Sequence, residues 1–247
     1  WNKALVRIAS TRDPSTISLP DRVLLYDDRT IAIYDAYAKA QYHFLVLPRI
    51  PFSISDGEKH ALNASDAEAK PALQAIDGKL GFGATTSNRV PQSHMQSIST
   101  LLSGPYARIV VDAMSKACSK VVEWIQNDMQ QRHGHIWEIS TAFHAVPSME
   151  HLHLHVISTD FVSTRLKHKK HFNSFHPTAG FAIPLSEVER LVSGEFPPVK
   201  KLPRTPKQYE EILKRPLQSH HTGESFRNMP ELKLHLESHW RETLLAL

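Results

Sequence analysis

A seven-residue run sets the strongest limit on what this 247-residue chain can fold into. The run from His151 to Ile157 reads His-Leu-His-Leu-His-Val-Ile. Successive side chains of a β-strand point to opposite faces, so His151, His153 and His155 are expected to share one face and the apolar side chains the other. The run therefore predicts a strand that is anchored in the core by one face and presents three imidazoles on the other.

Three imidazoles in a row suit chemistry at a phosphate. At about 3.3 Å per residue, neighbouring histidines stand roughly 6.7 Å apart, so the middle ring can reach phosphorus while the outer two touch its oxygens. Near neutral pH one imidazole nitrogen is free to attack, and a neighbouring ring can hold a proton. Attack at phosphorus gives a phosphoramidate, which water then cleaves.

Two other interpretations of the run remain open. Histidines at alternate strand positions can ligate zinc. Metal-bound histidines are usually oriented by a carboxylate, and none is obvious near this run. The alternating face can also be an exposed strand surface without a role.

The surrounding sequence predicts an α+β domain. Short β-prone runs precede the histidine run, and an apolar stripe at spacings of three and four predicts one long helix over 105–133. Segment 57–92 keeps no apolar period, and we expect a mobile insertion there. The expected strands are 23–26, 31–34, 43–47, 136–143 and 151–157.

Composition limits the class of protein further. One cysteine, Cys118, excludes an internal disulfide framework and a zinc site built from several thiolates of this chain. No run of 18 apolar residues occurs, so we expect no membrane span. Residues 161–247 carry 14 Lys and Arg against 9 Asp and Glu, which favours a polyanionic partner or a solvated basic surface.

Four segments together resemble a known family. The His-φ-His-φ-His-φ-φ run is similar to the signature of the histidine-triad hydrolases and transferases, which act on nucleoside phosphates. Segments 35–48, 143–149 and 158–175 resemble the aprataxin family of DNA-adenylate hydrolases within that superfamily. The resemblance implies the α+β histidine-triad fold, an antiparallel sheet with one long and one short helix, followed by a small C-terminal zinc-finger-like module.

The resemblance also implies roles for the histidines. His153 would be the nucleophile that takes AMP from a 5′-adenylated DNA end. His151 and His155 would flank the phosphate, with His155 assisting proton transfer. His144 matches a position near the active site or the DNA phosphates.

Further residues are implied to contact the nucleotide. Two apolar side chains would wall the adenine pocket, a carboxylate would hold the ribose hydroxyls, and the loop before the triad would offer donors to phosphate. One histidine would support the triad strand. Leu25 and Ile33 would form the walls, Asp35 would hold the ribose, and Ser148 and Met149 would offer the donors. His43 would support the strand, and Lys39 would lie near the site.

The basic segment directly after the triad is expected to lie at the mouth of the site. Cations there suit DNA phosphates, and an aromatic ring suits base stacking. A solvated surface is the alternative. The DNA-binding candidates are Lys167, Lys169, Lys170, His171, Phe172 and Asn173.

The C-terminal segment resembles a two-Cys, two-His finger that has lost its cysteines. His235 and His239 fit the second pair of ligands, but the usual cysteine positions hold Ser219 and Thr222, and hydroxyls are poor zinc ligands. Zinc held with help from other side chains and a metal-free finger with an apolar core both remain open. The other possible ligands are His220, His221 and Glu224, and the expected apolar core is Phe226, Leu232 and Leu236.

These inferences give one expected organisation: a catalytic domain at 1–175, a connecting segment at 176–205 and a finger-like DNA-binding module at 206–247. The expected activity is hydrolysis of the bond between AMP and a DNA 5′-phosphate, with DNA as partner, AMP as product and no cofactor for catalysis. A monomer and a nuclear location are expected. The alternatives are a hydrolase of small adenosine phosphoramidates or dinucleoside polyphosphates, and a non-catalytic DNA-end-binding module.

Overall fold

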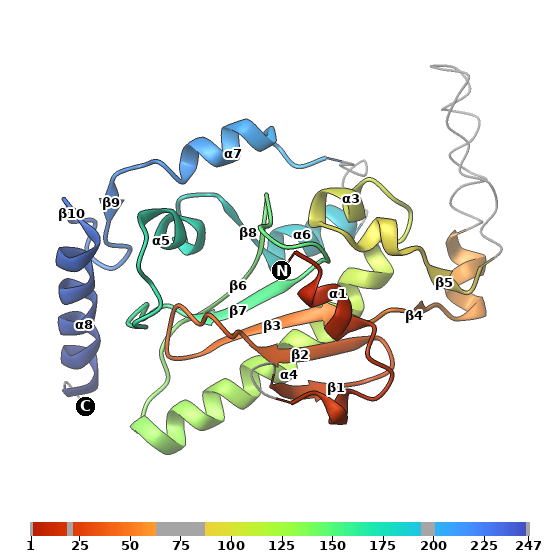
Figure 1. Ribbon diagram of the computed structural model, residues 1–247, viewed down its shortest axis with the longest axis horizontal. Coiled ribbons are helices and arrows are strands. Elements are labelled where there is room, and N and C mark those ends of the chain that lie inside the picture. The colour runs from red at the N-terminus through yellow and green to blue at the C-terminus, as the bar shows by residue number, and fades with distance from the viewer. Residues whose placement is uncertain (1, 19–21, 63–86, 194–200, 246–247) are drawn as a thin grey trace.

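A six-stranded antiparallel sheet forms the centre of the protein, as the computed structural model shows (Figure 1). The structure describes residues 2–18, 22–62, 87–193 and 201–245. The three strands expected before residue 50 are confirmed, and every neighbouring pair is antiparallel. In sheet order the strands are β1 (Val23–Tyr26), β2 (Thr30–Tyr34), β3 (His43–Pro48), β7 (Leu154–Ser158), β6 (Ile139–His144) and β8 (Ala182–Pro184).

The long helix α4 (Ala107–His133) covers one face of this sheet. Its apolar stripe packs on the strands, and the helix ends where Gly134 adopts a φ of +78°, a conformation that glycine reaches without a Cβ clash. The sequence prediction of this helix is confirmed. Its buried residues include Val110, Val111, Met114, Cys118, Val121 and Ile125.

Strand alternation places two kinds of side chain on the two faces. Phe44 and Val46 of β3 join the cluster under α4, whereas His43 and Leu45 point to the opposite face. Short elements cover that second face, among them α1 (Ala4–Ala9) and α5 (Lys169–Phe175). The histidines of β3 and β7 therefore lie on the face opposite the long helix.

The ends of the expected insertion are structured elements. Residues 63–86 lie outside the described part of the chain, so the expected mobility is not addressed there. Before them, Arg29 makes a bidentate pair with Glu58 at 2.8 and 2.7 Å. After them, β5 (Arg89–Val90) pairs with β4 (Phe52–Ser53), and the chain continues through η2 (Gln92–Met95) and α3 (Ile98–Leu102).

The first part of the expected connecting segment 176–205 belongs to the catalytic fold. Strand β8 extends the main sheet, and α6 (Leu185–Val192) packs on α4. Burial of Ile183 and Val188 explains why this part does not form a free linker. The expected boundary at residue 175 is therefore too early.

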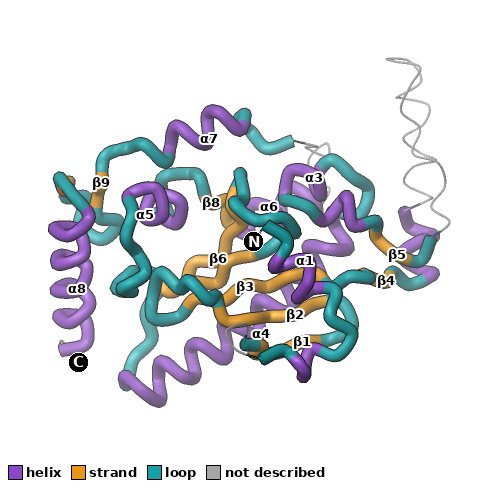
Figure 2. Tube along the Cα trace, viewed as in Figure 1, coloured by secondary structure: helices purple, strands orange, loops and turns teal. Residues whose placement is uncertain are grey.

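The C-terminal residues form a ββα unit at one end of the molecule (Figure 2). Helix α7 (Pro206–Ile212) leads to the short hairpin of β9 (Leu217–Gln218) and β10 (Ser225–Phe226), and α8 (Met229–Leu245) follows. The finger-like outline predicted from the sequence is present. No helix among the described residues has the length and apolar character needed to cross a membrane.

Candidate functional site

The histidine run enters the sheet later than the sequence predicts. Strand β7 begins at Leu154, and His151 has a φ of +84°, outside the extended region. The Nε2 of His151 lies 2.6 Å from the carbonyl oxygen of Pro48. The prediction that all three histidines lie along one regular strand is therefore wrong: His151 and His153 precede β7, and only His155 lies in it.

His153 presents an unprotonated nitrogen. Its Nδ1 lies 2.8 Å from the carbonyl oxygen of His151, and a carbonyl can only accept, so the ring carries its proton on Nδ1. The lone pair is then on Nε2. Burial lowers the pKa of His153 below its ordinary value, which keeps the ring neutral near pH 7. This is the state that a nucleophilic imidazole needs.

A chain of hydrogen bonds sets the opposite tautomer on His155. The backbone N–H of Lys39 donates to Nδ1 of His43 at 3.2 Å, so the proton of His43 is on Nε2. That Nε2 lies 3.0 Å from Nδ1 of His155 and donates to it. His155 therefore carries its proton on Nε2, a buried atom without a hydrogen-bond partner among the described residues. Such an N–H can donate to a phosphate oxygen.

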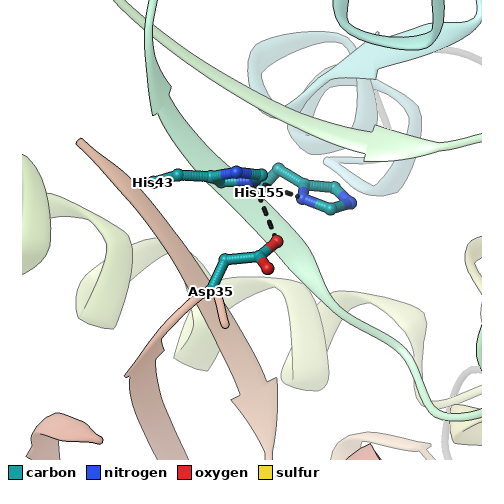
Figure 3. Close-up of side chains that lie close together, drawn as sticks. All are labelled: Asp35, His43 and His155. Atoms are coloured by element: carbon teal, nitrogen blue, oxygen red, sulfur yellow. Dashed lines mark hydrogen bonds and ion pairs between the residues drawn. The ribbon is translucent and has the colours of Figure 1, made fainter. Parts of the chain in front are cut away.

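Asp35 approaches the same nitrogen of His43 that faces His155 (Figure 3). One carboxylate oxygen lies 3.4 Å from Nε2 of His43, and the other accepts the backbone N–H of Tyr37 at 2.7 Å. The sequence did not reveal this carboxylate beside the histidines, because Asp35 and His155 meet only when β3 pairs with β7. The implied ribose contact of Asp35 stays a prediction.

The donor atoms of Asp35, His43 and His155 lie within 4.8 Å of one another, which raises the metal interpretation again. Their hydrogen bonds oppose it, since the lone pair of His155 Nδ1 accepts from His43 and that of His43 Nδ1 accepts from Lys39. The pKa of His43 is lowered to about 4 by burial first, although Asp35 opposes this, and the Lys39 charge lowers it further. A nearby ammonium repels a metal cation as well as a proton. The arrangement therefore fits a proton-positioning chain better than a metal site.

Further ring side chains surround the site and carry no charge near pH 7. His144 lies with its ring 4.3 Å from that of His155, and burial lowers its pKa to about 3. Burial lowers the pKa of His151 to about 4. Phe175 of α5 packs edge-on against His43 and His155 at 5.1 and 5.0 Å. Sequence reasoning missed Phe175, and the only signal was an aromatic residue at the end of the basic segment.

The residues predicted to wall the nucleotide pocket separate onto two faces. Ile33 and Met149 lie in the cluster on the histidine face, together with Leu45. Leu25 packs against the cluster under α4. A register shift lies between Val23 and Leu25, and the pocket role implied for Leu25 stays a prediction.

The other two nucleotide candidates differ in exposure. Ser148 is exposed in the loop between β6 and β7, where its hydroxyl is accessible to a ligand. Lys39 is buried, its Nζ donates to the carbonyl oxygen of Tyr37, and burial lowers its pKa. Their contacts with a nucleotide stay predictions.

The basic segment divides into an exposed and a buried part. Lys167, Lys169 and Lys170 are exposed, and His171 is half-buried. Phe172 is 0% exposed, which makes the predicted base stacking by this ring wrong. Its apolar surface is used instead in the packing of α5 on the fold.

Asn173, a predicted DNA contact, is buried, whereas Tyr37, which was not predicted, is exposed beside the basic segment. The amide of Asn173 is buried and donates to the carbonyl oxygens of Leu213 and Arg215 at 3.1 and 2.9 Å, so it joins α5 to the C-terminal residues rather than facing DNA. Tyr37, which sequence reasoning missed, is 46% exposed, and the guanidinium of Arg165 lies 5.5 Å from its ring centroid.

The possible zinc ligands of the finger contact one another directly. Nε2 of His235 lies 2.9 Å from Oγ of Ser219 and 3.5 Å from Oγ1 of Thr222. The ring of His239 stacks on that of His221 at 4.1 Å. Three of the four finger positions, Ser219, Thr222 and His235, therefore meet through hydroxyl–imidazole contacts.

Two family profiles match this chain. Residues 89–171 match "Scavenger mRNA decapping enzyme C-term binding", and residues 178–242 match "C2HE / C2H2 / C2HC zinc-binding finger". The first covers the triad and the second covers the ββα unit.

Curated relatives align over most of the chain. An aprataxin of Danio rerio is 30% identical over 97% of this chain and 53% of its own length. An aprataxin-like protein of Drosophila melanogaster is 29% identical over 98% of this chain and 27% of its own length. One from Saccharomyces cerevisiae is 29% identical over 74% of this chain and 72% of its own length. The chain thus spans about half or less of the first two relatives.

A solved structure has the same fold. The aprataxin ortholog Hnt3, in a crystal structure with DNA, superposes with a TM-score of 0.51 at 20% identity over 100% of this chain and 98% of that one. The match extends over both the sheet and the C-terminal ββα unit. The chain is therefore similar to aprataxins over nearly its whole length and shares the fold of the aprataxin ortholog Hnt3.

Proposed function

We propose that this chain removes AMP from 5′-adenylated DNA ends and leaves a 5′-phosphate. One observation carries the proposal: His153 holds a lone pair on Nε2 next to His155, which holds a proton on Nε2. The two rings lie 5.0 Å apart between centroids. A phosphate between them would meet a nucleophile and a hydrogen-bond donor at once.

The reaction follows from these two protonation states. Nε2 of His153 attacks the phosphorus of the AMP group, and the bond from that phosphorus to the bridging oxygen of the DNA 5′-phosphate breaks. The DNA phosphate leaves with the electron pair of that bond. His155 donates a hydrogen bond to the phosphate oxygens, and His43 holds the ring in the tautomer that can do so. Water then cleaves the phosphorus–nitrogen bond, which releases AMP and frees His153.

The basic side of the site supports DNA as the carrier of the AMP. Helix α5 presents Lys169 and Lys170 to solvent while its buried Phe175 packs against His155. Phosphates of a DNA strand that leaves the site would meet these cations. Curated relatives named aprataxin and the DNA complex of Hnt3 support the same substrate. A nuclear location and action as a monomer are part of the proposal.

Two alternatives make different predictions. A hydrolase of small adenosine phosphoramidates or dinucleoside polyphosphates needs no cations beside its site. A non-catalytic DNA-end-binding module needs no defined tautomers in the histidine cluster. The exposed lysines of α5 and the hydrogen-bond chain through His43 favour the DNA-adenylate hydrolase over both.

Replacement of the nucleophile tests the proposal. We expect His153→Ala to lower AMP release from adenylated nicked duplex DNA by on the order of 10⁴-fold or more, because the covalent route is lost. The matched control is His60→Ala, an exposed histidine remote in sequence from the triad. Adenylated DNA whose AMP group carries ³²P should label the wild-type protein through an acid-labile bond. The absence of this label in His153→Ala identifies the intermediate. Full AMP release by His153→Ala, or faster turnover of a small AMP ester than of adenylated DNA, contradicts the proposal.

A further inference from the structure

The C-terminal unit has the outline of a zinc finger but lacks its ligands. Zinc in proteins is held by cysteine thiolate, imidazole and carboxylate, whereas a serine or threonine hydroxyl is not among its usual ligands. Ser219 and Thr222 occupy the two positions at which the spacing to His235 and His239 calls for cysteine. The question is whether other side chains supply the missing donors.

The hydroxyl of Ser219 occupies the imidazole nitrogen of His235 that a metal would need. Its Oγ accepts the backbone N–H groups of His221 and Thr222 at 3.2 and 3.4 Å, so its own proton is directed at Nε2 of His235, 2.9 Å away. The proton of His235 is then on Nδ1, on the side of Glu224 at 3.8 Å. The lone pair of His235 that would bind zinc therefore accepts from Ser219.

The candidate replacement ligands point elsewhere. His220 has its Nε2 2.7 Å from the carbonyl oxygen of Thr159, at the end of β7. His221 stacks face to face on His239. Among the residues that the structure describes, no three acidic, histidine or cysteine side chains of this unit bring their donor atoms together as Asp35, His43 and His155 do. The side chains of the unit do not fit a zinc ion.

The apolar core of the unit is shared with the catalytic domain. Leu217, Leu232 and Leu236 lie 3% exposed or less in one cluster with residues of the catalytic domain. Burial of each such side chain stabilises the fold by about 1.5–3 kcal/mol. A finger that folds alone has a core too small to do without metal, whereas this one adds its side chains to a larger core. The partners across the contact are Ala40, Ile157, Phe161, Leu166, Phe172 and Phe175.

Polar contacts fix the same docking. His220 bonds to Thr159, and Asn173 of α5 donates to the carbonyl oxygens of Leu213 and Arg215 just before β9. The unit is thus tied to both segments that follow the triad. Its shape is determined by the catalytic domain and by the Ser219–His235 bond.

We propose that residues 206–245 form a zinc-free finger, in which the Ser219–His235 hydrogen bond and the core shared with the catalytic domain replace the metal. The unit is expected to keep its structure without any metal. It folds only together with the catalytic domain.

Metal analysis of the purified full chain tests the proposal. We expect less than about 0.1 zinc per chain by mass spectrometry after growth with added zinc, and no shift of the melting temperature when a strong chelator is added. The variant Ser219→Cys/Thr222→Cys is the positive control, because two thiolates complete a Cys₂His₂ set, and it is expected to hold one zinc that the chelator removes. Ser219→Ala is expected to lower the melting temperature by about 2–6 °C, since it leaves His235 and two N–H groups unpaired. The matched control for that variant is the exposed Ser193→Ala.

Substitutions at the two sites show whether any bound zinc lies in the finger or at the histidine site. One zinc per chain that is lost in His235→Ala or His239→Ala, or a chelator-induced fall in the melting temperature of the wild type, overturns the proposal. Zinc that persists in both variants and is lost in Asp35→Asn lies at the histidine site and leaves the finger metal-free. A fall of less than about 1 °C in Ser219→Ala overturns the role given to the Ser219–His235 bond.

Discussion

His43 and His155 face each other from neighbouring strands, with Nε2 of His43 3.0 Å from Nδ1 of His155. This contact decides which nitrogen of His155 carries a proton, and so whether that side chain can donate to a phosphate. We expect His43→Leu to lower kcat on adenylated DNA by on the order of 100-fold while KM changes little, because binding groups remain in place. His43→Gln keeps an N–H donor near the position of Nε2, and we expect it to recover most of the lost rate.

The control for these variants is the labelled AMP intermediate, which His43→Leu should still form slowly through His153. Thermal melting checks that both variants fold. A His43→Leu protein with the wild-type rate would show that the tautomer of His155 does not matter.

Buried neutral histidines should make the fold sensitive to acid. Burial lowers the folded-state pKa of His43 and His151 to about 4 and that of His144 to about 3, from an ordinary value of 6.5. Below pH 6.5 the unfolded chain binds protons that the folded chain does not, so the free energy of unfolding falls as the pH falls from 6.5 toward 4. Each group contributes up to about 1.4 kcal/mol per pH unit in that window.

Urea unfolding at pH 7, 6, 5 and 4.5 measures this effect. We expect a monotonic loss of stability below pH 6.5 and a shallower slope in His144→Phe, which removes one buried imidazole but keeps a ring. Stability that is constant from pH 7 to pH 5 would mean that these rings are protonated or exposed in the folded protein.

The amide of Asn173 joins α5 to the chain that leads into β9. We expect Asn173→Ala to lower the free energy of unfolding by about 1–3 kcal/mol, because the carbonyl oxygens of Leu213 and Arg215 lose their donor. The measurement is the urea midpoint of the full chain. Ser193→Ala, which removes one exposed hydrogen bond, should stay within about 0.5 kcal/mol of the wild type. Equal effects of the two substitutions would mean that the Asn173 contacts do not stabilise the docking.

The lysines of α5 should act on DNA through their charge. We expect Lys169→Gln/Lys170→Gln to weaken binding to duplex DNA of any sequence and to reduce the slope of log Kd against log salt by about 1.8, which is about 0.9 for each phosphate contact. The comparison is Lys116→Gln/Lys120→Gln, two exposed lysines on α4, which covers the other face of the sheet. The same loss of slope in both pairs would indicate a diffuse effect of net charge and no binding surface at α5.

The sequence was sufficient for the elements whose pattern is local. Strands β1, β2 and β3 and helix α4 all follow from apolar period and turn residues. The triad was also recognised from local alternation, although His151 and His153 precede the strand and Pro48 accepts the ring N–H of His151. The alternation of polar and apolar residues gives no information about this hydrogen bond, because Pro48 lies 103 positions away in the sequence.

The remaining errors share this cause. The register shift between Val23 and Leu25 leaves no mark in an otherwise regular apolar run. Phe172 and Asn173 look like DNA contacts in a basic segment, but the C-terminal unit covers them, and that docking depends on residues 40 or more positions later. Asp35 reaches His43 only after the turn between β2 and β3 is formed.

The apolar cluster that runs from Phe161 to Leu236 has a consequence for how such chains diverge. A domain whose core continues into its neighbour keeps that core when its metal ligands are replaced, because the shared apolar contacts remain. Proteins built in this way would be overlooked by any search that requires paired cysteines. They would be recovered by the spacing of Leu217, Leu232 and Leu236 behind a histidine triad.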